Sequence, residues 1–73
     1  MIKKYYFNLH LTYHEFLPYY EGQVHAIVVR TTDGIRIQFP ASHIRKYVTS
    51  TGIRGYFCMN TENNKFLSIT KIS

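Results

Sequence analysis

Residues 32–45 constrain the fold more than any other segment of this chain. Asp33-Gly34 is a tight hairpin signal, because glycine accepts the positive φ that such turns need. Residues 35–39 then alternate apolar and polar side chains, which is the period of a half-buried strand. Pro40 ends this strand, and its fixed φ also suits the first turn of a following helix. The residues expected to face the core from this strand are Ile35, Ile37 and Phe39.

The rest of the chain consists of short elements joined by turns. Thr12 and Glu15 have the spacing of a capping box, in which a hydroxyl and a carboxylate satisfy free amides at a helix start. The helix that follows contains Pro18, which removes a hydrogen bond, so we expect it to be short or kinked. Residues 23–31 lack clean alternation, which favours a strand covered on both faces. The expected elements are strand 3–11, helix 13–20, strand 23–31, strand 35–39, helix 41–48, strand 53–60 and strand 65–72.

This order, β-α-β-β-α-β-β, predicts a single α+β domain that spans residues 1–73. Two of the connections are local hairpins, so the five strands should be mostly antiparallel. The pattern is compatible with an open sheet under two short helices and with a small curled barrel. Gly55 lies in the middle of a predicted strand, where it would mark a bend or a bulge.

Composition sets the expected location of the protein. A single cysteine, Cys58, excludes an internal disulfide and fits a reducing compartment. The apolar runs are too short to span a bilayer, and no secretory signal is recognisable. We therefore expect a soluble, cytoplasmic protein without a membrane partner. Nine Lys and Arg against four Asp and Glu give a net charge of +5, which favours a polyanionic partner or solubility alone.

The chain carries no recognisable catalytic or metal-binding motif. Its four acidic residues are accounted for by a helix cap, by turns and by a helix end, so no pair is left for acid–base catalysis. His10 and His14 are separated by the expected strand-to-helix junction, and no set of Cys and His has metal-ligand spacing. No phosphate-binding loop, nucleophile elbow or dinucleotide fingerprint occurs. We therefore expect no enzymatic activity, no metal, no cofactor and no small-molecule substrate.

The best functional candidate is a basic and aromatic surface. If the apolar positions face the core, a set of arginine, glutamine and tyrosine side chains projects from the opposite side of the sheet. Arginine binds phosphates, and exposed tyrosine provides a stacking platform for single-stranded bases. This surface is extended by basic side chains on the second helix and by one histidine that has no evident role in folding. Its residues are Tyr6, Arg36, Gln38, His43, Arg45, Lys46, Arg54 and Tyr56. The hypothesis is a non-enzymatic module that binds RNA or single-stranded DNA.

A protein partner is the alternative to nucleic acid. Arginine and tyrosine are also ordinary residues on a solvated strand face. A small domain rich in tyrosine would gain stability by burying an edge strand or a tyrosine face in a homodimer. Pro40, His43 and the Tyr19-Tyr20 corner would then form the contact.

Several motifs along the chain resemble those of one protein family. They are the N-terminal Tyr5-Tyr6-Phe7, the Tyr19-Tyr20 pair, Thr32-Asp33-Gly34-x-x-Ile37-Gln38-Phe39-Pro40-Ala41-Ser42-His43, Gly52-Ile53-x-Gly55, and Glu62-Asn63-Asn64-Lys65-Phe66. Together they resemble a family of short bacterial proteins known only as a domain of unknown function. The resemblance covers nearly the whole chain and implies a small, stand-alone cytoplasmic protein. It implies no activity, and no catalytic residue can be carried over from it.

Overall fold

The structure is a computed structural model that describes residues 1–73. It contains five strands and one α-helix, together with two 3₁₀ turns at Ala41–His43 and Arg45–Tyr47. The strands and the helix are β1 (Ile2–Thr12), α1 (Tyr13–Tyr20), β2 (Ala26–Arg30), β3 (Arg36–Pro40), β4 (Gly52–Glu62) and β5 (Lys65–Lys71). The prediction of an α+β fold with five antiparallel strands is confirmed.

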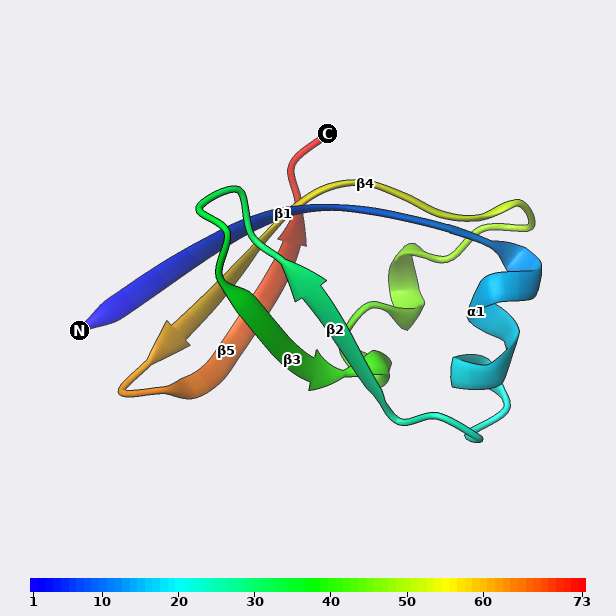
Figure 1. Ribbon diagram of the computed structural model, residues 1–73, viewed down its shortest axis with the longest axis horizontal. Coiled ribbons are helices and arrows are strands. Elements are labelled where there is room, and N and C mark those ends of the chain that lie inside the picture. The colour runs from blue at the N-terminus through cyan, green and yellow to red at the C-terminus, as the bar shows by residue number, and fades with distance from the viewer.

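The strands form two open sheets instead of one. A three-stranded sheet has the order β1-β4-β5, and β2 pairs with β3 in a separate two-stranded sheet. Every pairing is antiparallel. The β2–β3 hairpin crosses one face of the larger sheet, and α1 lies at the end of β1 (Figure 1). The curled barrel is therefore not the arrangement adopted, because neither sheet closes on itself.

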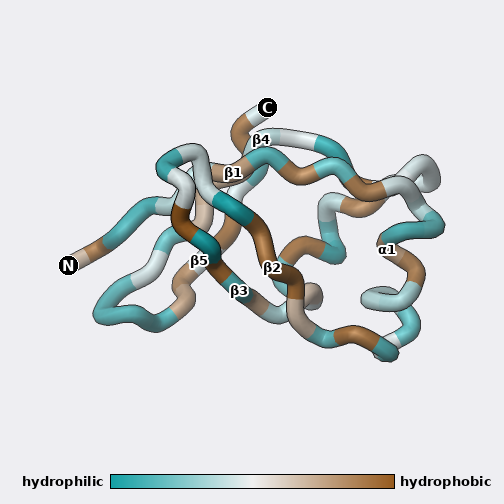
Figure 2. The backbone as a smooth tube through the Cα atoms, viewed as in Figure 1, coloured by the Kyte–Doolittle hydropathy of each residue, from teal (hydrophilic) through white to brown (hydrophobic).

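The core lies between the two sheets. Phe7 on β1 is fully buried, and its ring centroid lies 5.7 Å from those of both Phe39 on β3 and Phe57 on β4. Phe16 of α1 closes the same cluster from the helix side. The most hydrophobic run of the hairpin, Ile27–Val29, is the brown segment of β2 in Figure 2. We call the side of the β1-β4-β5 sheet that carries Phe7 the inner face, and the opposite side the outer face.

The start of α1 follows the predicted capping box. The Thr12 amide donates to Glu15 Oε1 at 2.9 Å, and the Glu15 amide donates to Thr12 Oγ1 at 3.2 Å. The bond from the Thr12 amide favours the ionised carboxylate and, together with a smaller contribution from the Thr12 hydroxyl, holds the pKa of Glu15 below its ordinary value. The helix runs through Pro18 to Tyr20, so it has the predicted bounds despite the proline.

The predicted second helix, 41–48, is wrong in type. Two 3₁₀ turns replace it, because Ile44 between them has φ −113° and ψ 0° and interrupts the helical backbone. Ile44 is fully buried, so its side chain is fixed in the core while the backbone on either side turns separately. A segment of only eight residues gains too little from helical hydrogen bonds to override this packing.

Two predictions about the hairpin are also wrong. Ile35 was expected in the core but is 49% exposed, because it lies at the hairpin tip. Hydrogen bonds between Thr31 and Ile35 close the turn there, beyond the covered part of the sheet. The predicted strand 23–31 is shorter, Ala26–Arg30, and only one of its faces is covered. Val28 is exposed because nothing packs on the outer side of a two-stranded sheet.

Two glycines of β4 are required by close approaches of the backbone. Gly52 has φ +120°, and a Cβ at this position would collide with the Leu11 carbonyl oxygen and lie 2.7 Å from the Thr12 carbonyl carbon. At Gly55 a Cβ would lie 2.8 Å from the Ser73 oxygen, so this glycine accommodates the last residues of the chain. The expected bulge is therefore not at Gly55; the register between β4 and β5 shifts at Asn60/Thr61.

Candidate functional site

The outer face of the β1-β4-β5 sheet is a polar surface to which three strands contribute. Alternate residues of β1 and β4 reach it, because residues such as Phe7 and Phe57 occupy the inner face. The register places His10 opposite Arg54, Asn8 opposite Tyr56 and Lys4 opposite Asn60. The outer-face residues from β1, β4 and β5 include Ile2, Lys4, Tyr6, Asn8, His10, Arg54, Tyr56, Cys58, Asn60, Glu62, Lys65, Ser68 and Thr70.

Two tyrosines stack at the centre of this face. Tyr6 and Tyr56 are diagonal neighbours across β1 and β4, with ring centroids 6.0 Å apart and planes inclined by 15°. Tyr6 is 36% exposed, and Tyr56 is half-buried. The near-parallel rings form one aromatic platform on the sheet. Such a pair is worth about 0.5–1.5 kcal/mol beyond its buried area, so the platform is held in place before any ligand arrives.

Positive charge lies at both ends of the platform. Lys4 is on one side of Tyr6, and Arg54 and His10 are on the far side of Tyr56. Arg54 and Lys4 are exposed. Three of the four acidic residues lie elsewhere: Glu15 and Glu21 at the two ends of α1, and Asp33 in the hairpin turn. The fourth, Glu62, is the last residue of β4, and the register places it on the outer face, opposite Ile2 of β1 and Lys65 of β5.

A shallow hollow adjoins this platform. Its volume is about 380 Å³, and Arg54 and Tyr56 form one wall. The residues that line it are Asn8, Leu9, His10, Arg54, Gly55, Tyr56 and Ser73. Because four of them carry polar or charged side chains from the outer face, the hollow extends the platform with hydrogen-bonding groups.

Arg36 and Gln38 do not belong to this surface. Both are exposed on β3, but they point away from Phe39, which packs against Phe7 on the inner face. The β2–β3 sheet lies on the inner face, so its own outer side is on the opposite surface of the molecule from Tyr6 and Tyr56 (Figure 1). The expected continuous surface is therefore split, because the sequence pattern could not show that the strands form two sheets.

The three remaining predicted residues lie on the 3₁₀ turns, and one of them is explained by packing. His43 is half-buried and stacks on Phe66 of β5, with ring centroids 3.8 Å apart and planes inclined by 13°. Lys46 Nζ lies 5.2 Å from the centroid of the Tyr47 ring. Arg45 Nη2 donates to the Tyr20 carbonyl oxygen at 2.9 Å, and its guanidinium carbon lies 4.8 Å from the centroid of the Tyr20 ring. None of the three adjoins the tyrosine platform.

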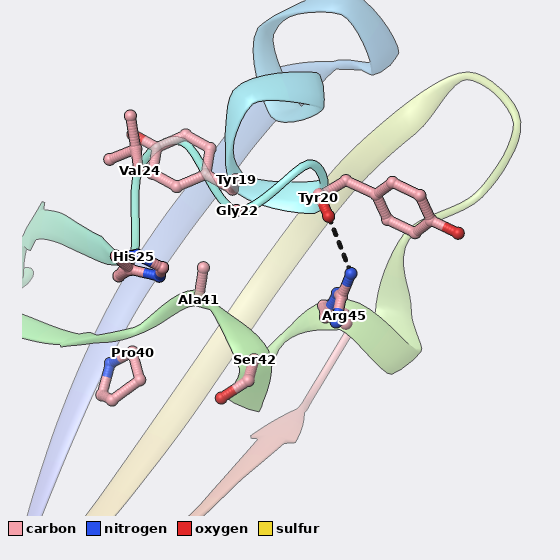
Figure 3. Close-up of a pocket in the computed structure, with 9 residues that line it drawn as sticks. All are labelled: Tyr19, Tyr20, Gly22, Val24, His25, Pro40, Ala41, Ser42 and Arg45. Carbon is pink, nitrogen blue, oxygen red and sulfur yellow. Dashed lines mark hydrogen bonds between the residues drawn. The ribbon is translucent and has the colours of Figure 1, made fainter.

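A second hollow, which we call the Arg45 hollow, lies between the end of α1 and the first 3₁₀ turn (Figure 3). It brings together Pro40 and the Tyr19-Tyr20 corner, as the alternative hypothesis expected, whereas His43 is not part of it. Tyr19 packs against Phe16, and Tyr20 is 56% exposed. Sequence reasoning missed Val24 and His25, which line the hollow because Gly22 turns the chain back across it.

The structure adds three observations on metal binding, the cysteine and membrane spans. No group of three or more His, Cys, Asp or Glu lies close enough to hold a metal ion. Cys58 is buried, and its Sγ lies 3.8 Å from Asn60 Oδ1. None of the helices has both the length and the apolar character needed to cross a membrane.

Comparison with known proteins gives one match. A family model described as a protein of unknown function (DUF2835) matches residues 3–72. No curated protein and no solved structure matched the chain.

Proposed function

We propose that this protein, which belongs to the DUF2835 family, is a non-enzymatic module that binds single-stranded nucleic acid on its outer face. The observation that carries the proposal is the Tyr6–Tyr56 platform, which is partly exposed to solvent and has Lys4 and Arg54 at its two ends. Aromatic rings that stack on bases and cations that bind phosphates are the two components of single-strand recognition.

The two kinds of residue would act on different parts of the ligand. Bases stack on the exposed surface of the platform, since every base has a flat face and stacking tolerates any sequence. Lys4 and Arg54 bind the phosphates that flank the stacked bases. Asn8, opposite Tyr56, supplies a donor and an acceptor between these contacts. The surface is short, so we expect a site of about four nucleotides, the lower end of the range for small single-strand binding domains.

The geometry favours a single strand over a duplex. The bases of a duplex are stacked on one another, so a flat platform cannot reach their faces without unpairing them. The major groove of B-DNA admits a helix or a two-stranded ribbon. Here α1 has eight residues and carries no arginine or lysine, so it is poorly suited to enter a charged groove. The two-stranded β2–β3 sheet packs Ile27, Val29 and Phe39 into the core, so it is not a free ribbon.

The proposed location is the cytoplasm. A single cysteine leaves no internal disulfide, and a free, buried thiol is compatible with a reducing compartment where nucleic acid is available. The net charge of +5 supports association with a polyanion.

The test is a titration of fluorescently labelled single-stranded RNA and DNA, followed by anisotropy at several salt concentrations. Two phosphate contacts predict that log K falls with log[salt] with a slope of about −1.4, since each contact on a single strand contributes about −0.7. Arg54→Gln should weaken binding and reduce the slope by about 0.7.

Arg36→Gln is the matched control, because Arg36 is also an exposed strand arginine but lies on the opposite surface. It should leave both affinity and slope close to those of the unmodified protein. Absence of binding at low salt, or equal losses in the two variants, would contradict the proposal.

A homodimer is the second candidate, because β5 is an edge strand of the larger sheet. Leu67 and Ile72 are about half exposed along it. The Ile69 carbonyl already accepts from the Tyr47 hydroxyl at 3.0 Å, so only part of this edge is free to pair. Light scattering at high protein concentration distinguishes the candidates: a strict monomer excludes the dimer, and it leaves the nucleic-acid proposal intact.

A further inference from the structure

The Arg45 hollow is a second surface with the character of a ligand site, and it is separate from the outer face. It has a volume of about 310 Å³, which corresponds to about ten water molecules in liquid water. The side chains of Tyr19, Val24 and Ala41 form its apolar part, while Arg45 and His25 bring nitrogen atoms toward it (Figure 3). A hollow with apolar walls and a few converging polar groups is the usual form of a small-molecule site.

Arg45 is held in position by the protein. Its Nη2 donates to the Tyr20 carbonyl oxygen, and its guanidinium group lies against the Tyr20 ring. These contacts restrict a long, flexible side chain in advance, so less conformational entropy is lost when a ligand binds. A guanidinium group has five N–H donors, and the Tyr20 carbonyl accepts only one of them. The remaining donors are available to a ligand.

The charge of Arg45 is not compensated within the hollow. The residues that line it include no aspartate or glutamate. Glu21 is adjacent in sequence but is an exposed C-cap residue of α1 and is not among the lining residues. An exposed cation beside apolar walls attracts a ligand that combines a negative group with an apolar body.

We propose that the Arg45 hollow binds a small organic carboxylate. The carboxylate pairs with the free donors of Arg45, whose planar fork matches its two oxygen atoms. The apolar body of the ligand lies against Tyr19, Val24 and Ala41, and the hollow has room for roughly ten non-hydrogen atoms. The proposal is independent of nucleic-acid binding, since none of these residues lies on the outer face.

Benzoate is a suitable probe, because it joins a carboxylate to a flat apolar ring of the right size. We would titrate the ¹⁵N-labelled protein with sodium benzoate at constant ionic strength and follow the backbone amides and the Arg45 Nε by NMR. The expected result is a saturable shift at Gly22, His25, Ser42 and Arg45, with no comparable change at Tyr56 or Cys58. Benzyl alcohol, which lacks the charge, should bind more weakly by about tenfold or more.

Substitutions separate this site from unspecific attraction of anions. Arg45→Gln should weaken benzoate binding by about 10–100-fold, which is the loss of affinity expected when one hydrogen bond to a charged group is removed. Arg36→Gln, on the β3 strand, should leave it unchanged. Val24→Asp is a second variant at an exposed position, and its carboxylate should repel the probe while the protein stays folded.

Three results would overturn the proposal. The first is shifts that do not saturate at millimolar benzoate and that spread over all lysines and arginines. The second is an equal effect of Arg45→Gln and Arg36→Gln. The third is inorganic phosphate binding as strongly as benzoate, because the apolar walls would then contribute nothing.

Discussion

Replacing Gly52 by alanine should destabilise this protein much more than replacing Gly22 by alanine. Both residues have positive φ, +120° for Gly52 and +82° for Gly22, so alanine is strained at both positions by about 1–2 kcal/mol. Their surroundings differ. No atom lies within 4 Å of a Cβ built at Gly22, whereas at Gly52 it would meet the backbone of Leu11 and Thr12.

The extra cost at Gly52 can be worked from the hydrogen bonds at this junction. Backbone atoms cannot rotate away as a side chain does, so β4 must separate from the end of β1. That movement breaks the bond from the Tyr13 amide to the Thr51 carbonyl and the pairing of Thr12 with Gly52 at the end of the β1–β4 ladder. Each is worth about 1 kcal/mol, so Gly52→Ala should cost about 3–4 kcal/mol in total. The free energy of unfolding of a domain of this size is about 4–11 kcal/mol.

Urea unfolding and thermal unfolding, both followed by circular dichroism, give the free energy of unfolding and the Tm of both variants. Gly22→Ala should lower the free energy of unfolding by about 1–2 kcal/mol, which corresponds to a fall in Tm of at least about 4 °C. Gly52→Ala should lower the Tm by at least about 12 °C, since each kcal/mol moves it by about 4–8 °C. Equal losses in the two variants would refute the reasoning, because strain alone would then explain both.

Three further predictions rest on single contacts. Tyr6→Leu should weaken binding of the labelled oligonucleotide by about 1–3 kcal/mol, because it removes one ring of the platform. Tyr13→Leu is the control, since Tyr13 is an exposed tyrosine outside the platform, and it should leave binding unchanged. Similar losses of binding in the two variants would argue against stacking. Tyr47→Phe removes the hydroxyl that donates to the Ile69 carbonyl, so it should lower the free energy of unfolding in urea by about 0.5–1.5 kcal/mol. An unchanged urea midpoint would show that water replaces this bond. The lowered pKa of Glu15 stabilises the fold above its ordinary pKa of 4.5, and this contribution is lost as the pH falls through the folded-state pKa. The stability difference between the unmodified protein and Glu15→Gln should therefore shrink below pH 4.5, and a difference that stays constant with pH would contradict the assignment.

Local signals were sufficient for the parts of the fold that neighbouring residues determine. The capping box of Thr12 and Glu15 gave α1 its correct bounds, and alternation gave β1 and its inner residue Phe7. The same reasoning identified both platform residues, Tyr6 and Tyr56, and the neighbouring Arg54, since alternate positions of a strand reach one face. None of these predictions depended on knowing which strands pair.

Contacts between distant segments could not be predicted in this way. Arg36 and Gln38 were placed with Tyr6 because nothing in the alternation distinguishes one sheet from two. His43 appeared free because its partner, Phe66, lies 23 residues further along the chain. Arg45 was identified as a candidate, but its fixed position depends on Tyr20, which is separated from it by 25 residues.

The pairing of β1 with β4 has a consequence for how the protein is made. Ile2 is opposite Glu62, so the first strand has no complete partner until β4 has been synthesised. Only the β2–β3 and β4–β5 hairpins are local enough to form early, since contacts between distant residues form more slowly. The platform joins Tyr6 from the first strand to Tyr56 from the fourth, so it forms only when these two strands pair. Ligand binding on the outer face would thus report the late, long-range step of folding.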